Sequence, residues 1–69
     1  MNTLIGNKIK EIRKKKGLSQ EKLARLIVMD RTYICRVEAG KINMTIDTLY
    51  LFCKGLGISL SSFFGSLNI

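Results

Sequence analysis

The chain has 69 residues, lacks proline and histidine, and carries a formal net charge of +7. This length suffices for one small domain, residues 1–69, and the longest apolar run, residues 49–53, is far too short to cross a bilayer. Positions 1–45 hold eleven basic and four acidic residues, whereas positions 46–69 hold one of each, so we expect one face that meets a polyanion and another that meets a protein.

The first predicted helix covers residues 3–16. Ile5, Ile9 and Ile12 recur at i, i+4 and i+7, which is typical of the apolar stripe of a helix. Basic residues cover much of the remaining surface and cluster at the end of the helix, where cations are favoured. A lysine run is usually a solvated face, but Lys16 is also a candidate for a phosphate contact. A basic helix lying on a membrane is the other interpretation, although packing in a folded domain explains the stripe more simply.

Two short helices joined by a tight turn are predicted between residues 18 and 40. Ser19 and Asp30 are good N-caps for these helices, and Gly40 is a good end for the second. The apolar positions with helical spacing are Leu23, Ala24 and Ile27 in the first helix and Ile34 and Val37 in the second. Helices with so short a link must cross at a steep angle, which is the geometry of a helix-turn-helix.

The second of these helices has an outward face suited to DNA. With about 100° of rotation per residue, Thr32, Cys35 and Arg36 point outward if the apolar positions point inward. A major groove admits a helix, and arginine can donate two hydrogen bonds to guanine. The candidate base contacts are Arg31, Thr32, Tyr33, Cys35 and Arg36. The alternative is an ordinary surface helix with arginines on its solvated side.

Two further helices are predicted after a loop at residues 41–44. Thr45 caps the first, which runs to about Leu56, and Ser59 caps the second, over residues 60–64. The candidate buried positions of the longer helix are Ile46, Leu49, Phe52, Cys53 and Leu56. Because so small a domain has little interior for more large apolar groups, the candidate dimer contacts are Leu60, Phe63, Phe64 and Leu67, with at least one phenylalanine expected in the core instead.

No catalytic or metal-binding pattern is visible in the sequence. Cys35 and Cys53 do not make a metal site, which needs more ligands at closer spacing. We find no nucleophile–base arrangement and no phosphate-binding glycine loop. We therefore expect no enzymatic activity, no cofactor and no small-molecule ligand. In the absence of a secretion signal we expect a cytoplasmic protein with reduced thiols.

Several short elements recur at family-specific spacing: GLSQE at 17–21, LA at 23–24, Ile34, VE at 37–38, Gly40, TL at 48–49 and LGI at 56–58. Together they resemble the Cro/C1-type helix-turn-helix family of phage repressors and bacterial regulators. The run DRTYI at 30–34 is most similar to the controller proteins of restriction–modification systems. The resemblance implies an all-α, compact five-helix domain of the lambda-repressor-like type.

The resemblance also assigns roles to single residues. Gln20 would hold a DNA phosphate at a helix N-terminus, where free N–H groups favour anions. Arg13, four residues before a glycine, would pair with Glu38 and tie the first helix to the third. Lys41 and Asn43 join Lys16 as the further candidates for phosphate contacts.

The turn between the two short helices departs from the family pattern. Val28 stands where many relatives have glycine or asparagine. That position is often left-handed, which costs a non-glycine residue about 1–2 kcal/mol. Either the turn differs here, or packing of Val28 and Met29 offsets the strain.

The function predicted from these features is a sequence-specific transcriptional regulator. We expect a homodimer on a roughly palindromic double-stranded DNA operator, controlling restriction–modification genes. The alternatives are a prophage-type repressor and an antitoxin-like module whose apolar C-terminal half binds a different protein.

Overall fold

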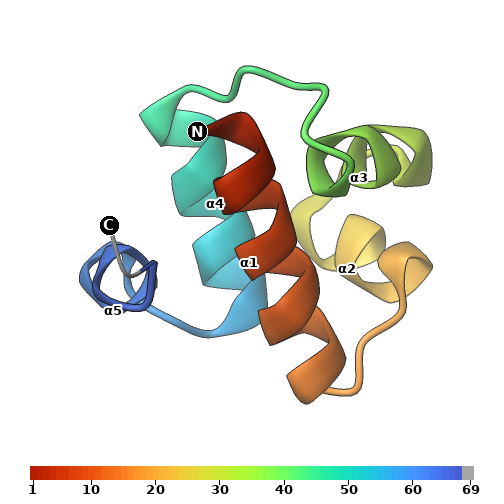
Figure 1. The fold of residues 1–69 in the computed structure, drawn as a ribbon. Helices are drawn as coiled ribbons and strands as arrows, with labels where there is room; N and C mark the ends of the chain where they lie inside the picture. The colour runs from red at the N-terminus through yellow and green to blue at the C-terminus, as the bar shows by residue number, and fades with distance from the viewer. Residues whose placement is uncertain (68–69) are drawn as a thin grey trace.

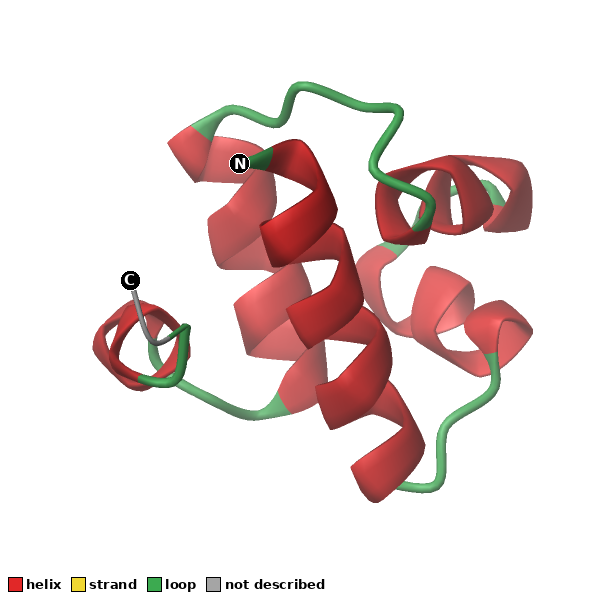
Figure 2. Cartoon of the chain, in the orientation of Figure 1, coloured by secondary structure: helices red, strands yellow, loops and turns green. Residues whose placement is uncertain are grey.

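The computed structural model describes residues 1–67, and over this range the chain forms five α-helices and no strand. The helices are α1 (Asn2–Lys15), α2 (Gln20–Ile27), α3 (Arg31–Glu38), α4 (Ile46–Leu56) and α5 (Leu60–Gly65). Figure 1 shows α1 and α4 running through the middle, with α2 and α3 on one side and α5 on the other; Figure 2 shows the loops that join them. The all-α class and the five helices predicted from the sequence are confirmed.

Side-chain caps explain why the helices begin where they do. The Ser19 hydroxyl accepts a hydrogen bond from the Lys22 backbone N–H at 3.0 Å, and the Asp30 carboxylate accepts one from the Thr32 backbone N–H at 2.8 Å. Thr45 and Ser59 cap α4 and α5 in the same way. Each cap satisfies an N–H group that has no partner inside its helix.

One apolar core joins all five helices. It consists of Ile9, Leu23, Ala24, Ile27, Ile34, Val37, Leu49, Phe52, Cys53, Leu56, Phe63 and Leu67. The expectation that Ile46 is buried was wrong: its side chain is 59% exposed, because it occupies the first position of α4 at the edge of the packed region. Burial raises the pKa of the Cys53 thiol, so this cysteine behaves as an apolar core residue.

Gly6 has a packing role that the sequence did not reveal. It lies within α1 and is buried against the last turn of α3. A Cβ atom at this position would overlap the carbonyl oxygen of Val37. The absence of a side chain therefore lets α1 approach the end of the recognition helix and helps to fix its position.

The turn between α2 and α3 keeps the left-handed conformation despite its valine. Val28 has φ 56° and ψ 54°, and its side chain is 89% exposed. The turn is closed by a hydrogen bond of 2.8 Å from the Met29 N–H to the Ala24 carbonyl oxygen. Of the two explanations considered above, a different turn is wrong, and packing by Val28 itself is also wrong. Only Met29 packs partly against the core.

We expect Val28→Gly to raise the free energy of unfolding by about 1 kcal/mol. Glycine removes the left-handed strain of about 1–2 kcal/mol, while the extra freedom of the unfolded chain returns about 0.4–1 kcal/mol. Urea denaturation followed by circular dichroism measures the change. A loss of stability would contradict the structure, because it would mean that this exposed side chain makes stabilising contacts.

Candidate nucleic-acid interface

The outward face of α3 carries most of the predicted base contacts. Arg31, Thr32, Cys35 and Arg36 are all exposed on this short helix. Tyr33 is partly buried, and its ring lies 6.4 Å from that of Phe52, centroid to centroid. The tyrosine therefore packs against the core with one side, and only its remaining edge is available to a ligand.

A buried polar network lies behind the first turn of α2. The Arg13 guanidinium donates to both carboxylate oxygens of Glu38, at 2.6 and 3.1 Å, and to the Leu18 carbonyl oxygen at 2.7 Å. The side chains of Arg13 and Glu38 are 8% and 3% exposed. The ion pair expected from the sequence is present, and Glu38 lies in the interior rather than on the flank of α3.

Gln20 extends this network to the surface. Its Nε2 donates to Glu38 Oε1 at 3.0 Å. An ionised carboxylate only accepts hydrogen bonds, so the amide nitrogen faces Glu38, and its second hydrogen remains free. This contact links the start of α2 to the end of α3 across 18 positions, and no local pattern in the sequence pointed to it.

The other candidate phosphate contacts lie in separate places. Lys41 and Asn43 are exposed on the loop that follows α3. Lys16 is exposed after the end of α1, and its Nζ lies beside Gly57 at the end of α4. Lys16 therefore extends the basic surface toward α4 rather than toward α3.

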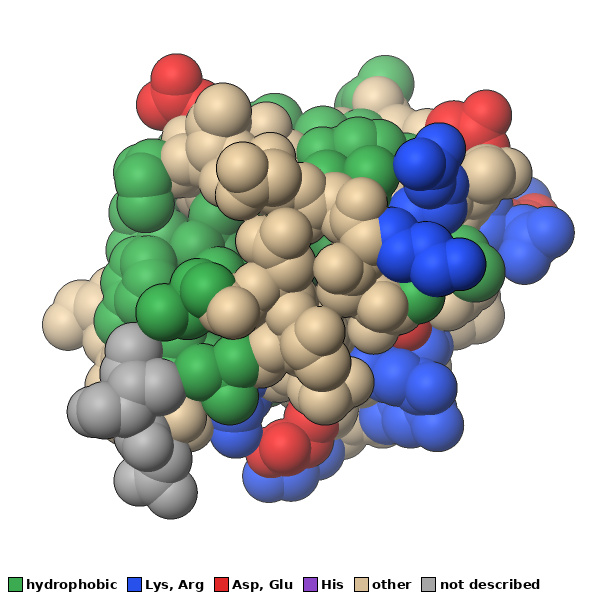
Figure 3. Space-filling view, turned by 45° about the horizontal axis from the view of Figure 1, so that its top comes forward, with side chains coloured by type: hydrophobic (Ala, Val, Ile, Leu, Met, Phe, Trp, Pro, Cys, Tyr) green, Lys and Arg blue, Asp and Glu red, His purple; other side chains and the backbone are tan. Residues whose placement is uncertain are grey.

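Charge and apolar surface are segregated. Figure 3 shows most basic side chains on the side of α2 and α3, whereas apolar side chains gather on the side of α4 and α5. The structure buries Phe63 and Leu67, which are 0% and 3% exposed. These two residues complete the core under α5 and leave the candidate dimer surface, as expected for one phenylalanine but not for Leu67.

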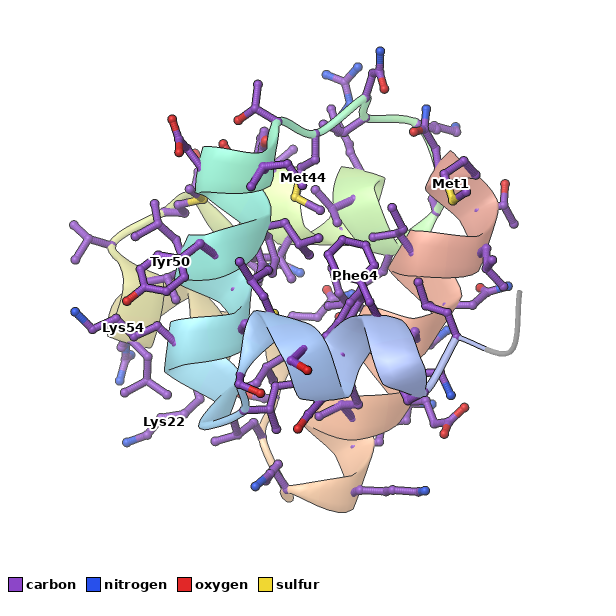
Figure 4. All side chains as sticks on the ribbon, turned by 90° about the vertical axis from the view of Figure 1, so that its left-hand side faces the viewer. Met1, Lys22, Met44, Tyr50, Lys54 and Phe64 are labelled. Atoms are coloured by element: carbon purple, nitrogen blue, oxygen red, sulfur yellow. The ribbon has the colours of Figure 1, made fainter. Side chains whose placement is uncertain are left out.

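The apolar surface that remains includes residues the sequence analysis missed. Phe64 is 39% exposed and Leu60 partly exposed. Figure 4, which faces α5, shows Phe64 projecting toward the side on which Met44 and Met1 lie. Met1 is 73% exposed and Met44 packs partly against the core. Both residues are distant from α5 in sequence, so periodicity within a single helix could not identify them.

The described residues hold no other candidate centre. Within residues 1–67, no three potential metal ligands lie together. None of the helices in this range combines the length and the apolar character needed to cross a bilayer.

Two short helices, a tight left-handed turn and an exposed polar second helix define a helix-turn-helix protein. A family model described as helix-turn-helix matches residues 9–63, and the chain belongs to this family. The resemblance to controller proteins is confirmed by the relatives. The chain is 46% identical over 64 residues to the control protein C.MunI of Mycoplasma sp, covering 91% of this chain and 86% of the relative.

Two further comparisons agree. Identity to the control protein C.BamHI of Bacillus amyloliquefaciens is 41% over 56 residues, covering 80% of this chain and 69% of the relative. Among solved structures, the restriction–modification controller protein C.Esp1396I, crystallised as a tetramer with its natural 35 base-pair operator, superimposes with a TM-score of 0.91. That match has 42% identity and covers 96% of this chain and 87% of the other.

Proposed function

We propose that this protein is a sequence-specific transcriptional regulator that binds operator DNA as a homodimer and controls restriction–modification genes in the cytoplasm. The observation that carries the proposal is the outward face of α3, which exposes Arg31, Thr32 and Arg36 on a helix held from behind by a buried ion pair. The similarity to C.Esp1396I, a controller protein crystallised with its operator, supports the same class of ligand.

The proposed docking places α3 in the major groove and the start of α2 on the backbone. Arg31 in the first turn of α3 reads a base edge, since the N-terminal part of this helix meets the bases in such motifs. Gln20 donates its free Nε2 hydrogen to a phosphate, together with the unpaired N–H groups at the start of α2. Lys41, Asn43 and Lys16 add backbone contacts on either side.

We expect Gln20→Ala to weaken binding to every operator variant by a similar factor. A phosphate contact carries no sequence information, so the order of preferred bases should stay the same while affinity falls by about 1 kcal/mol. Titration of a panel of single-base operator variants measures both quantities. A loss confined to one base position would contradict the assignment.

The proposed dimer uses the apolar surface formed by Leu60, Phe64, Met44 and Met1. A two-fold axis through this surface presents two copies of α3 to DNA on one side, matching half-sites about one DNA turn apart. The segregation of apolar and basic surface in Figure 3 is consistent with this arrangement.

We expect Phe64→Ser to raise the dissociation constant of the dimer at least tenfold, equivalent to about 1.4 kcal/mol. Tyr50→Ser is the matched control, because Tyr50 is a similarly exposed aromatic residue of α4 at 52% and lies outside the proposed surface. Analytical ultracentrifugation measures both variants. Equal effects of the two substitutions would place the interface elsewhere.

An electrophoretic mobility-shift assay with the DNA upstream of the gene tests the function as a whole. We expect a shifted complex that survives excess non-specific DNA, with a two-fold symmetric footprint. A neighbouring endonuclease or methyltransferase gene identifies the regulated system. Binding that non-specific DNA removes completely would overturn the proposal.

A further inference from the structure

A groove between α2 and α4 contains none of the residues proposed to contact DNA or to form the dimer. Its volume is about 390 Å³, and its lining consists of Leu26, Ile27, Val28, Leu51, Lys54 and Gly55. A Cβ atom on Gly55 would overlap the side chain of Ile27. The two helices are therefore packed directly against each other, and this contact gives the groove a fixed floor.

The walls of the groove are apolar and exposed. Leu26 is 51% exposed, Leu51 40% and Val28 89%. Single exposed apolar side chains are normal on a protein surface. Three of them from two helices around one hollow provide a continuous surface that another apolar side chain can fill.

Val28 adds a second, independent observation. It combines a left-handed backbone with the highest exposure among the large apolar residues, and neither property stabilises the free protein. Natural sequences generally agree with their local structure except at functional sites. A contact that Val28 makes in a complex would account for both properties.

The charges around the groove define the chemistry of its occupant. Among the described residues that line it, Lys54 is the charged one. Lys22 precedes Leu26 by one helical turn, and Figure 4 shows Lys22 and Lys54 extending from the same edge of the molecule. An apolar groove bordered by two ammonium groups fits an amphipathic helix with an apolar stripe and acidic flanks.

A second copy of this chain does not offer such a helix. Its acidic groups are mostly engaged: Glu11 pairs with Lys8, Glu21 with Arg25, Glu38 with Arg13, and Asp30 caps α3. The occupant is therefore a different protein. Val28 precedes Arg31 by three residues, so an occupant that touches Val28 lies next to the DNA that α3 reads.

We propose that this groove docks an acidic amphipathic helix of RNA polymerase bound at the neighbouring promoter. The proposal rests on the proposed function, because it requires a regulator that is itself bound to DNA. It makes the contact between regulator and polymerase a cooperative one, in which each protein raises the affinity of the other for the same DNA fragment.

The test measures operator affinity with and without purified RNA polymerase holoenzyme on a fragment that holds both operator and promoter. We expect polymerase to raise the affinity of the natural protein about tenfold, within the usual range of such couplings. Val28→Gly and Lys54→Glu should bind the operator normally when polymerase is absent and lose this increase. Because Val28→Gly is expected to stabilise the fold, its loss of coupling could not be attributed to unfolding.

Ile46→Gln is the matched control, since Ile46 is a 59% exposed apolar residue of α4 that does not line the groove. It should keep the full increase. The proposal is overturned if both groove variants keep the increase, if the control loses it as well, or if polymerase has no effect on the natural protein. Failure of the natural protein to bind the operator alone would instead overturn the proposed function.

Discussion

Glu38→Ala is expected to leave most of the protein unfolded at physiological temperature. The substitution leaves the Arg13 guanidinium buried without its carboxylate, and breaking a buried pair in this way costs about 3–5 kcal/mol. A domain of this size has a total stability of roughly 3–10 kcal/mol, so the loss is comparable with the whole. Thermal and urea denaturation followed by circular dichroism measure the effect.

A double variant, Arg13→Met with Glu38→Leu, separates the buried charge from the packing. Apolar residues of similar size can replace a buried ion pair with little loss of stability, so the double variant should fold better than Glu38→Ala. It should still bind operator DNA more weakly, because Gln20 loses the carboxylate that orients its amide. A cost below about 1 kcal/mol for Glu38→Ala would show that the pair is solvated rather than buried.

The local elements of this fold could be predicted from the sequence because their signals are local. Ser19, Asp30, Thr45 and Ser59 each accept a hydrogen bond from the backbone two or three residues ahead. Gly57 has a positive φ at the end of α4. Such contacts depend on neighbouring residues only, so the helix bounds followed within about one residue.

The errors concern contacts between distant parts of the chain. Periodicity marks Ile46 and Leu67 as apolar but does not say whether a core or a second molecule covers them. The structure exposes Ile46 at the edge of α4 and buries Leu67 under α5. The link between Gln20 and Glu38 also depends on how two helices cross, which no spacing rule describes.

Arg31→Ala is expected to cost about 1–3 kcal/mol of operator affinity and to relax the preference at one base position. Arg31 is exposed at the first position of α3, directly after the Asp30 cap that orients this end of the helix. Over the described residues, the ion pairs involve neither Arg31 nor Arg36. Both guanidinium groups therefore reach the DNA without first giving up an acidic partner.

Arg25→Ala is the matched control for this experiment. Arg25 is an exposed arginine one helix earlier, and its Nη2 lies 2.8 Å from a carboxylate oxygen of Glu21. Its removal should leave the order of preferred bases unchanged. Binding to a complete set of single-base operator variants, measured at several salt concentrations, distinguishes the roles of the arginines. A base-reading arginine changes the preference at one position, whereas a phosphate-binding arginine weakens all sequences and lowers the salt slope by about one unit.

Arg36 can follow either pattern, because it lies more than one turn further along the exposed face of α3 and reaches a guanine or a phosphate with similar ease. Arg31 should follow the first pattern alone. If Arg31→Ala left the order of preferred bases intact, the leading end of α3 would not be the part that reads DNA. The helix would then enter the groove with Thr32 and Arg36 foremost, and the start of α2 would be displaced from the phosphate proposed for Gln20, because the Gln20–Glu38 contact couples the positions of the two helices.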